Sequence, residues 1–151
     1  MTNISIKNKM EILIKASDKF LDKIAKEYSL TLIELKIIIF LHENEDNNLA
    51  KDITKYLGTT KSLISMSVSS LINKKMLTKK IDDFDKKKIR LFLTDKTGEI
   101  INKANIEKMK IKDIILHGIT KEEIEEMNSI LKKMSDNINK LDKDMKENDY
   151  V

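Results

Sequence analysis

Hydrophobic residues recur every three or four positions along most of the chain, which predicts a mainly helical protein. In the first segment this spacing is kept by Met10, Leu13, Ser17, Phe20, Ile24 and Tyr28. The pattern is interrupted over residues 29–32. Thr31 and Glu34 then form a T-x-x-E capping box, in which each side chain accepts a hydrogen bond from the other residue's backbone N–H. We therefore predict a second, largely buried helix from Thr31 to about His42.

Two short helices and a hairpin are predicted between residues 49 and 94. The polar loop 45–48 leads into a helix that is closed by Gly58. Its inward-facing residues are Leu49, Ile53, Tyr56 and Leu57. Thr59 or Thr60 caps the next helix, whose apolar face consists of Ile64, Val68, Leu71 and Ile72. Residues 76–81 and 88–94 flank the charged sequence DDFDKK, and this arrangement predicts a β-hairpin with a charged tip.

Two longer helices are predicted to complete the chain. Thr94 is expected to cap the first of them, which runs through Ile115, and a capping box of Thr120 with Glu123 opens the second. In this last helix the apolar residues that step by threes and fours are Ile124, Met127, Leu131, Met134, Ile138, Leu141 and Met145. They form a narrow apolar seam with charged flanks. Such a seam usually packs against another helix, so the first six of these residues are our candidate dimer contact.

Charge is distributed unevenly along the chain. Residues 49–94 hold eleven Lys and Arg against four Asp and Glu, a net charge of +7, whereas the rest of the chain has a net charge of −3. A basic segment of this size favours a polyanionic partner such as nucleic acid. The order helix, turn, helix and basic hairpin predicts a winged helix-turn-helix within this segment.

Candidate DNA-contacting residues follow from how such a motif binds. The second helix presents polar side chains from its N-terminal half to base edges in the major groove. The candidates on this recognition helix are Thr60, Lys61, Ser62, Ser65, Met66 and Ser69. Lys51 and Lys55 on the preceding helix are expected to meet phosphates. The hairpin, or wing, is expected to hold the flanking backbone or enter a minor groove. Its candidates are Lys79, Asp85, Lys86, Lys87, Lys88 and Arg90.

The wing sequence DDFDKKKIRLFLTDKTG resembles that of the MarR family of bacterial transcriptional regulators, and the resemblance covers almost the whole chain. Asp85 and Lys87 occupy the Asp and Arg positions of the family's D-x-R pattern. Leu93, Thr94 and Gly98 match its L-T and Gly positions. In the preceding stretch LINKKMLTK, Lys75 replaces the usual Gly and Lys79 the usual Arg. Lys75 is therefore expected to take a strained left-handed conformation.

The resemblance implies one domain over residues 1–151. It would comprise a winged helix-turn-helix lobe at 30–94 and a helical dimerisation lobe from 1–28 and 95–148. It also implies a homodimer on a pseudo-palindromic DNA site, which commonly acts as a repressor. Members of the family release DNA when a small anionic or phenolic effector binds between the lobes. No residue of the sequence identifies such an effector.

Metal and enzyme chemistry find little support in the sequence. There is no Cys, so thiolate metal sites and disulfides are excluded. His42 and His117 are the only histidines, and two isolated histidines make a poor zinc site. No phosphate-binding loop, nucleophile motif or hydrolase motif is present. We therefore expect no catalytic activity and no cofactor. Without an apolar signal-peptide core or a long apolar run, we also expect a cytoplasmic protein with no membrane partner.

A different class of function fits the same pattern. A winged helix can serve as a protein-interaction module, because fold does not fix function. In that alternative the apolar seam of the last helix binds a partner protein. Salt dependence distinguishes the two, since binding through phosphates weakens steeply with salt and apolar association does not.

Overall fold

The most apolar helix of the chain, α2 (Leu32–Glu43), lies in the middle of the core in the computed structural model, which describes residues 5–148. Leu35, Ile37 and Ile38 on this helix have no exposed surface. Each fully buried aliphatic side chain stabilises the fold by about 1.5–3 kcal/mol relative to exposure. The predicted buried helix is therefore confirmed, and it forms the support for the elements around it.

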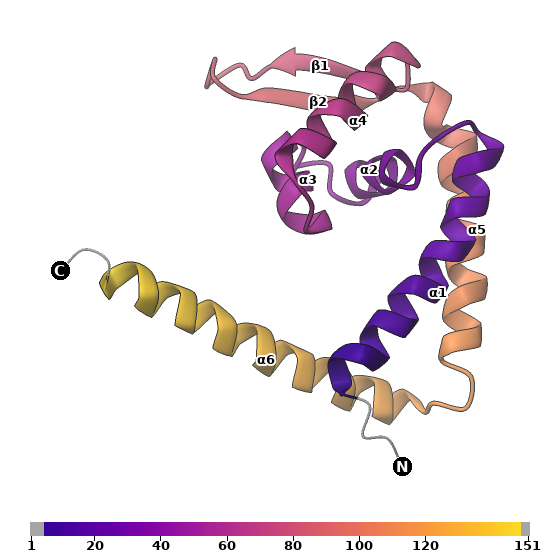
Figure 1. Cartoon of the computed structure of the whole chain (residues 1–151), viewed down its shortest axis with the longest axis vertical. Helices are drawn as coiled ribbons and strands as arrows, with labels where there is room; N and C mark the ends of the chain where they lie inside the picture. The colour runs from indigo at the N-terminus through magenta and orange to yellow at the C-terminus, as the bar shows by residue number, and fades with distance from the viewer. Residues whose placement is uncertain (1–4, 149–151) are drawn as a thin grey trace. The chain divides into compact units, whose positions relative to one another are not determined.

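Most of the other elements surround α2, and their order is the predicted one (Figure 1). The bounds are α1 (Ile6–Glu27), α3 (Ala50–Leu57), α4 (Lys61–Asn73), β1 (Leu77–Ile81), β2 (Ile89–Leu93) and α5 (Gly98–Ile115). The two strands pair antiparallel, with Leu77 opposite Leu93 and Ile81 opposite Ile89. The structure is thus mainly α with a small β-hairpin, as predicted, and the hairpin projects beyond α4.

The chain divides into two compact units between Lys112 and Asp113. The core described above belongs to the first unit. Helix α6 (Lys121–Asn148) makes up most of the second, and its Thr120–Glu123 capping box is present as predicted. Among the described residues, no helix combines the length and apolarity needed to cross a membrane.

Local sequence signals set the ends of the helices in the first unit. Thr31 and Glu34 form the predicted capping box at the start of α2. The hydroxyl of Thr60 accepts from the backbone N–H of Leu63 and caps α4. Gly58 ends α3 with φ +59°, a left-handed conformation that glycine adopts without a Cβ penalty.

Two predictions about individual residues were wrong. Tyr56 was expected to face inward from α3, but it is 63% exposed, and only its ring contacts the core by packing against Phe40 with a centroid distance of 4.7 Å. Thr94 was expected to cap α5, but a 3-10 turn, Asp95–Thr97, intervenes. The Thr94 hydroxyl instead donates to the carbonyl oxygen of Lys75 at 2.8 Å. That bond ties the end of the wing to the turn that precedes it.

Lys75 has φ +59°, which confirms the expected left-handed conformation. A non-glycine residue in this region costs roughly 1–2 kcal/mol. The conformation is held by backbone bonds that close α4, from the N–H of Lys75 to Ile72 and from the N–H of Met76 to Leu71. The chain thereby turns sharply from the recognition helix into the wing.

Glu34 is a buried carboxylate that joins α2 to α4. Lys74 Nζ donates to its Oε2 at 2.8 Å and to the carbonyl oxygen of Ser29 at 2.9 Å. Burial raises the pKa of Glu34, but hydrogen bonds from Lys74, Ser70 and the Thr31 backbone outweigh it, so the pKa is lowered overall. The carboxylate is therefore charged and fully paired, and it fixes the position of α4 on the core.

Candidate nucleic-acid interface

Helix α4 presents a polar face to solvent because its other face is anchored in the core. Ile64 and Leu71 are completely buried and Ser67 is nearly so. The exposed positions on the opposite face are Lys61, Ser62, Ser65, Met66 and Ser69. Thr60, the remaining candidate, is also exposed and caps the helix. Met66 is 68% exposed, so it is not a core residue.

The recognition helix and the wing enclose a groove of about 400 Å³. Among the residues that line the groove are five of the candidate DNA contacts, namely Lys51, Lys61, Ser65, Ser69 and Lys79. Its apolar lining residues include Val68, Ile72, Ile89 and Leu91. Three lysines and two hydroxyls along one groove could hold a phosphate backbone beside a base edge. The sequence predicted these residue types, and the fold brings them together from α3, α4 and the hairpin.

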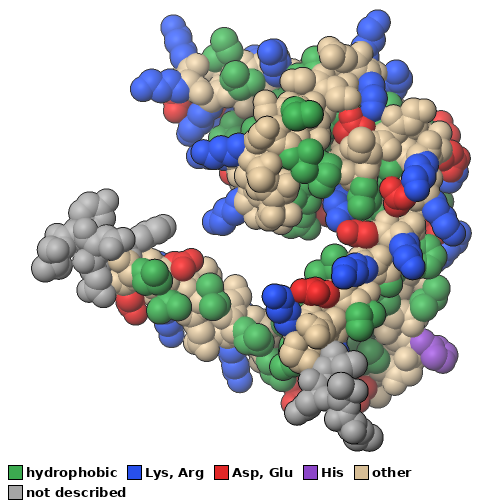
Figure 2. Space-filling model, in the orientation of Figure 1, with side chains coloured by type: hydrophobic (Ala, Val, Ile, Leu, Met, Phe, Trp, Pro, Cys, Tyr) green, Lys and Arg blue, Asp and Glu red, His purple; other side chains and the backbone are tan. Residues whose placement is uncertain are grey.

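The other basic candidates lie around this groove. Lys55 is exposed near the end of α3 but does not line it. Lys86, Lys87 and Lys88 are exposed at the tip of the hairpin. Figure 2 shows Lys and Arg side chains gathered over the hairpin and its neighbouring helices. The basic surface therefore extends from the groove to the wing tip.

The wing tip is ordered by two aspartates. Oδ1 of Asp82 accepts from the backbone N–H groups of Phe84 and Asp85 at 2.9 and 2.8 Å. Oδ1 of Asp85 accepts from the N–H of Lys87 at 3.0 Å, and Lys88 N–H donates to the Asp85 carbonyl oxygen. The predicted candidate Asp85 thus shapes the turn and holds the backbone that carries Lys87.

Arg90 is engaged within the protein. Its guanidinium donates to Asp82 and to Oδ1 of Asn48, the latter at 2.8 Å. The hydrogen bond from Arg90, together with those from the Asp85 and Phe84 N–H groups, lowers the pKa of Asp82 to about 2. Asp82 is consequently ionised at every physiological pH. Asp82 and Asn48 were missed from the sequence; the D-x-x-D spacing of the turn could have pointed to Asp82, because Asp commonly accepts from N–H groups two residues on.

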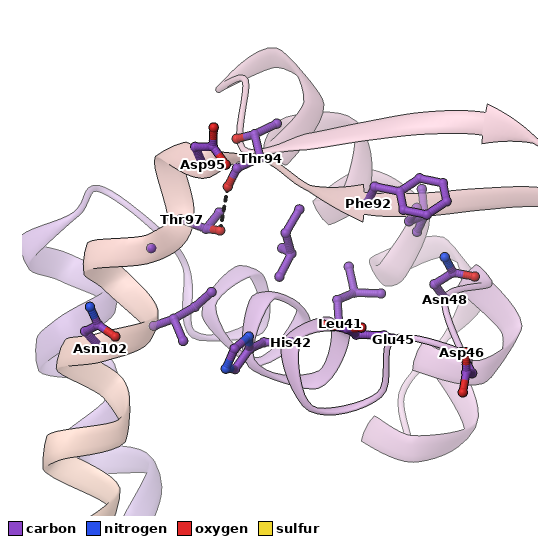
Figure 3. Close-up of a pocket in the computed structure, with 14 residues that line it drawn as sticks. Leu41, His42, Glu45, Asp46, Asn48, Phe92, Thr94, Asp95, Thr97 and Asn102 are labelled. Atoms are coloured by element: carbon purple, nitrogen blue, oxygen red, sulfur yellow. Dashed lines mark hydrogen bonds between the residues drawn. The ribbon is translucent and has the colours of Figure 1, made fainter.

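A second cavity, of about 680 Å³, lies between the end of α2, strand β2 and the start of α5 (Figure 3). Leu41, Leu91 and Ile101 contribute apolar lining. Three of the lining residues are acidic, and two of these, Asp46 and Asp95, lie at opposite ends of the cavity (Figure 3). Its volume falls within the roughly 300–1,000 Å³ typical of pockets that bind small organic molecules. Its acidic side chains do not all gather at one point.

The histidines do not form a metal site with their surroundings. His42 lines the cavity just described, and His117 is exposed beyond the end of α5. Among the side chains that the structure describes, residues 5–145, no group of three or more His, Cys, Asp or Glu could hold a metal ion together.

The six candidate dimer-contact residues of the last helix, which we call the α6 seam, are largely exposed along α6. Five of its six residues, Met127, Leu131, Met134, Ile138 and Leu141, are 41–59% exposed, and Ile124 is partly covered. Figure 2 shows hydrophobic side chains at intervals along α6. A helix with this much exposed apolar surface is typical of one that packs against a partner.

No family model and no curated protein matches the sequence. Solved structures do match the fold. A MarR-family regulator from Listeria monocytogenes, complexed with 26mer DNA, has a TM-score of 0.78 and 22% identity, with 89% of each chain covered. MepR from S. aureus in complex with DNA has a TM-score of 0.76 and 17% identity over 91% of this chain and 99% of that one. A MarR protein from Peptoclostridium difficile has a TM-score of 0.75 and 24% identity over 91% of both chains. At these identities the likeness establishes the fold.

Proposed function

We propose that this chain, which has the winged-helix fold of MarR-family transcriptional regulators, is itself a sequence-specific DNA-binding regulator that acts as a homodimeric repressor in the cytoplasm. The observation that carries the proposal is the groove between α4 and the wing. It collects lysines from three elements beside the serines of the recognition helix. Two of the fold relatives, MepR and the Listeria regulator, were solved with DNA. We assign the chain no catalytic activity and no cofactor.

The proposed contacts divide into two kinds. Lys51, Lys55, Lys61 and the wing lysines would neutralise phosphates, which gives affinity but no sequence information. Ser62, Ser65 and Ser69 would hydrogen-bond base edges, and Met66 would contact a thymine methyl group. Asp85 and Arg90 act differently in this proposal, because both are engaged in shaping and anchoring the wing.

Dimerisation is proposed to use α1, α5 and α6 from two copies of the chain. The exposed α6 seam supports this, since its removal from water on association is favourable by about 25 cal/mol per Å² of apolar surface. Residues 1–28 and 95–148 would then form the dimerisation lobe and residues 30–94 the DNA-binding lobe. A dimer would present two recognition helices to half-sites about one helical turn apart.

A small-molecule effector is proposed to regulate DNA binding. The cavity between α2, β2 and α5 is a candidate binding site for the effector. Strand β2 forms one wall of this cavity and also carries Arg90, which anchors the wing. A ligand that binds better when the wing is displaced would lower DNA affinity by its differential affinity for the two states.

The proposal is tested by measuring the affinity of the full chain for duplex DNA between about 50 and 200 mM salt. A regulator that contacts six or more phosphates is expected to lose roughly 10³-fold or more in affinity over this range. The alternative, an interaction module that uses the α6 seam, predicts association with a protein partner that hardly responds to salt. Absence of DNA binding at low salt would contradict the proposed function.

A further inference from the structure

Phe84 is the most exposed large hydrophobic residue of the described chain, at 101% of its reference surface. It lies in the turn of the wing, and its ring contributes nothing to the core. Ile81, the last residue of β1, pairs with Ile89, the first residue of β2, and each is at least half exposed. The outer end of a strongly basic hairpin therefore carries an apolar tip.

The turn holds Phe84 in a fixed place. Its backbone N–H donates to Asp82, and Asp82 is bonded to Arg90, which in turn donates to Asn48 in the body of the protein. Ordering a flexible turn on binding would cost about 1–2 kcal/mol per residue. Because the turn is already hydrogen-bonded, most of that cost is avoided when the tip meets a partner.

The charges around Phe84 indicate what that partner is. The two acidic residues beside it are balanced, since Lys80 pairs with Asp83 at 3.3 Å and Lys88 with Asp85 at 3.8 Å. Lys86 and Lys87 make no ion pair among the described residues. An aromatic ring next to two such lysines is complementary to a polyanion that also offers an apolar or stacking surface. DNA has both in its minor groove, which is about 6 Å wide and 7.5 Å deep.

We propose that Phe84 is a minor-groove wedge, which inserts at a base step beneath the wing and partly unstacks it. The inference rests on the proposed function and adds a source of sequence preference to it. Pyrimidine–purine steps such as TA are the easiest to unstack, so the protein would prefer them at a position that its recognition helix does not touch. The lysines of the wing would hold the phosphates on either side.

Phe84→Ala and Phe84→Trp test the wedge without disturbing the turn, because Asp82 bonds the backbone of residue 84 and not its side chain. The DNA is a duplex of roughly 40 base pairs, long enough for two half-sites and their flanks, taken from genomic fragments that the protein enriches. 2-Aminopurine, which brightens on unstacking, is placed at successive steps under the wing. Lys87→Ala serves as the electrostatic control.

We expect Phe84→Ala to lose about 5- to 50-fold in DNA affinity, which is the range for the loss of one base–aromatic contact. The slope of log affinity against log salt concentration, here called the salt slope, should not change. Lys87→Ala should reduce the slope by about 0.9 per monomer instead. Phe84→Trp should retain affinity, and the 2-aminopurine signal should rise at one step with the wild-type protein and not with Phe84→Ala. Replacing that step by a stiff AA step should weaken wild-type binding and leave Phe84→Ala unaffected.

Equal affinity and equal 2-aminopurine signals for the wild-type protein and Phe84→Ala would overturn the wedge while leaving the regulator intact. Failure of the wild-type protein to bind DNA in a salt-dependent manner would overturn the proposed function and the wedge together. A change in Phe84→Trp emission with anionic lipid vesicles or on self-association, but not with DNA, would assign the apolar tip to another partner and also overturn the wedge.

Discussion

Nη1 of Arg90 in the wing lies 2.8 Å from Oδ1 of Asn48, the residue just before the first turn of the helix-turn-helix. The contact is reinforced by the backbone, because the N–H of Leu91 donates to the carbonyl oxygen of Asn48 at 2.9 Å. Asn48 is only 4% exposed. One buried residue thus fixes the wing relative to α3 and α4, which is the geometry that forms the groove.

Asn48→Ala should loosen the wing. The loss of a hydrogen bond to a charged group is expected to lower the free energy of unfolding by about 1–2 kcal/mol. It should also weaken DNA binding several-fold, because the loosened wing of the variant would have to be ordered when DNA binds. Chemical denaturation and DNA titration measure the two effects. Asn47→Ala, at an exposed neighbouring position, is the matched control and should change neither. Equal behaviour of the two variants would show that the contact does not position the wing.

Lys75→Gly should stabilise the protein. Lys75 has φ +59°, and glycine relieves the strain of that conformation at the expense of a more flexible unfolded chain. The net gain expected in the free energy of unfolding is about 0.5–1 kcal/mol. Lys110→Gly, within α5, is the control and should destabilise by about 1 kcal/mol, as glycine does inside helices. A loss of stability in Lys75→Gly would mean that the lysine side chain contributes more to stability than its left-handed backbone conformation costs.

Leu131→Lys should weaken the proposed dimer. A charge in the α6 seam would have to be desolvated on association, so we expect the dimer dissociation constant to rise at least tenfold. Sedimentation velocity over a range of concentrations measures the change. Lys133→Ala, an exposed residue of the same helix outside the seam, should leave the dimer unchanged. An unaffected dimer in Leu131→Lys would place the dimer contact elsewhere.

Lys87→Ala and Ser65→Ala should affect DNA binding in different ways. Loss of a phosphate contact weakens binding to all sequences and reduces the salt slope. Loss of a base contact changes preference at particular base pairs by about 1–3 kcal/mol. Competition assays with mutated operator duplexes distinguish the two patterns. If both variants lose affinity equally on operator and random DNA, the assigned division between positioning and reading residues is wrong.

Much of the fold could be predicted because its signals are local. The Thr31–Glu34 and Thr120–Glu123 capping boxes and the cap at Thr60 depend on residues only a few positions apart. The left-handed Lys75 has no such local signal and was expected only from the resemblance to the MarR family, which has Gly at this position. The apolar spacing likewise predicted the buried helix α2.

The parts that could not be predicted depend on contacts between distant segments. Tyr56 has the spacing of a core residue, but α3 is short and lies at the edge of the core. Arg90 is the only arginine of the chain, but its place in a basic hairpin grouped it with the neighbouring lysines, and only the fold brings it to Asn48, 42 positions earlier. The 680 Å³ cavity is lined by residues of α2, β2 and α5, so no single stretch of sequence indicates it.

Recognition of a specific DNA sequence by a dimer of this chain is best tested by mixing the purified full chain with fragmented genomic DNA from its source at moderate salt and sequencing the retained fragments. We expect enrichment of a short inverted repeat with half-sites about one helical turn apart. Retention without a common motif, or no retention, would contradict it.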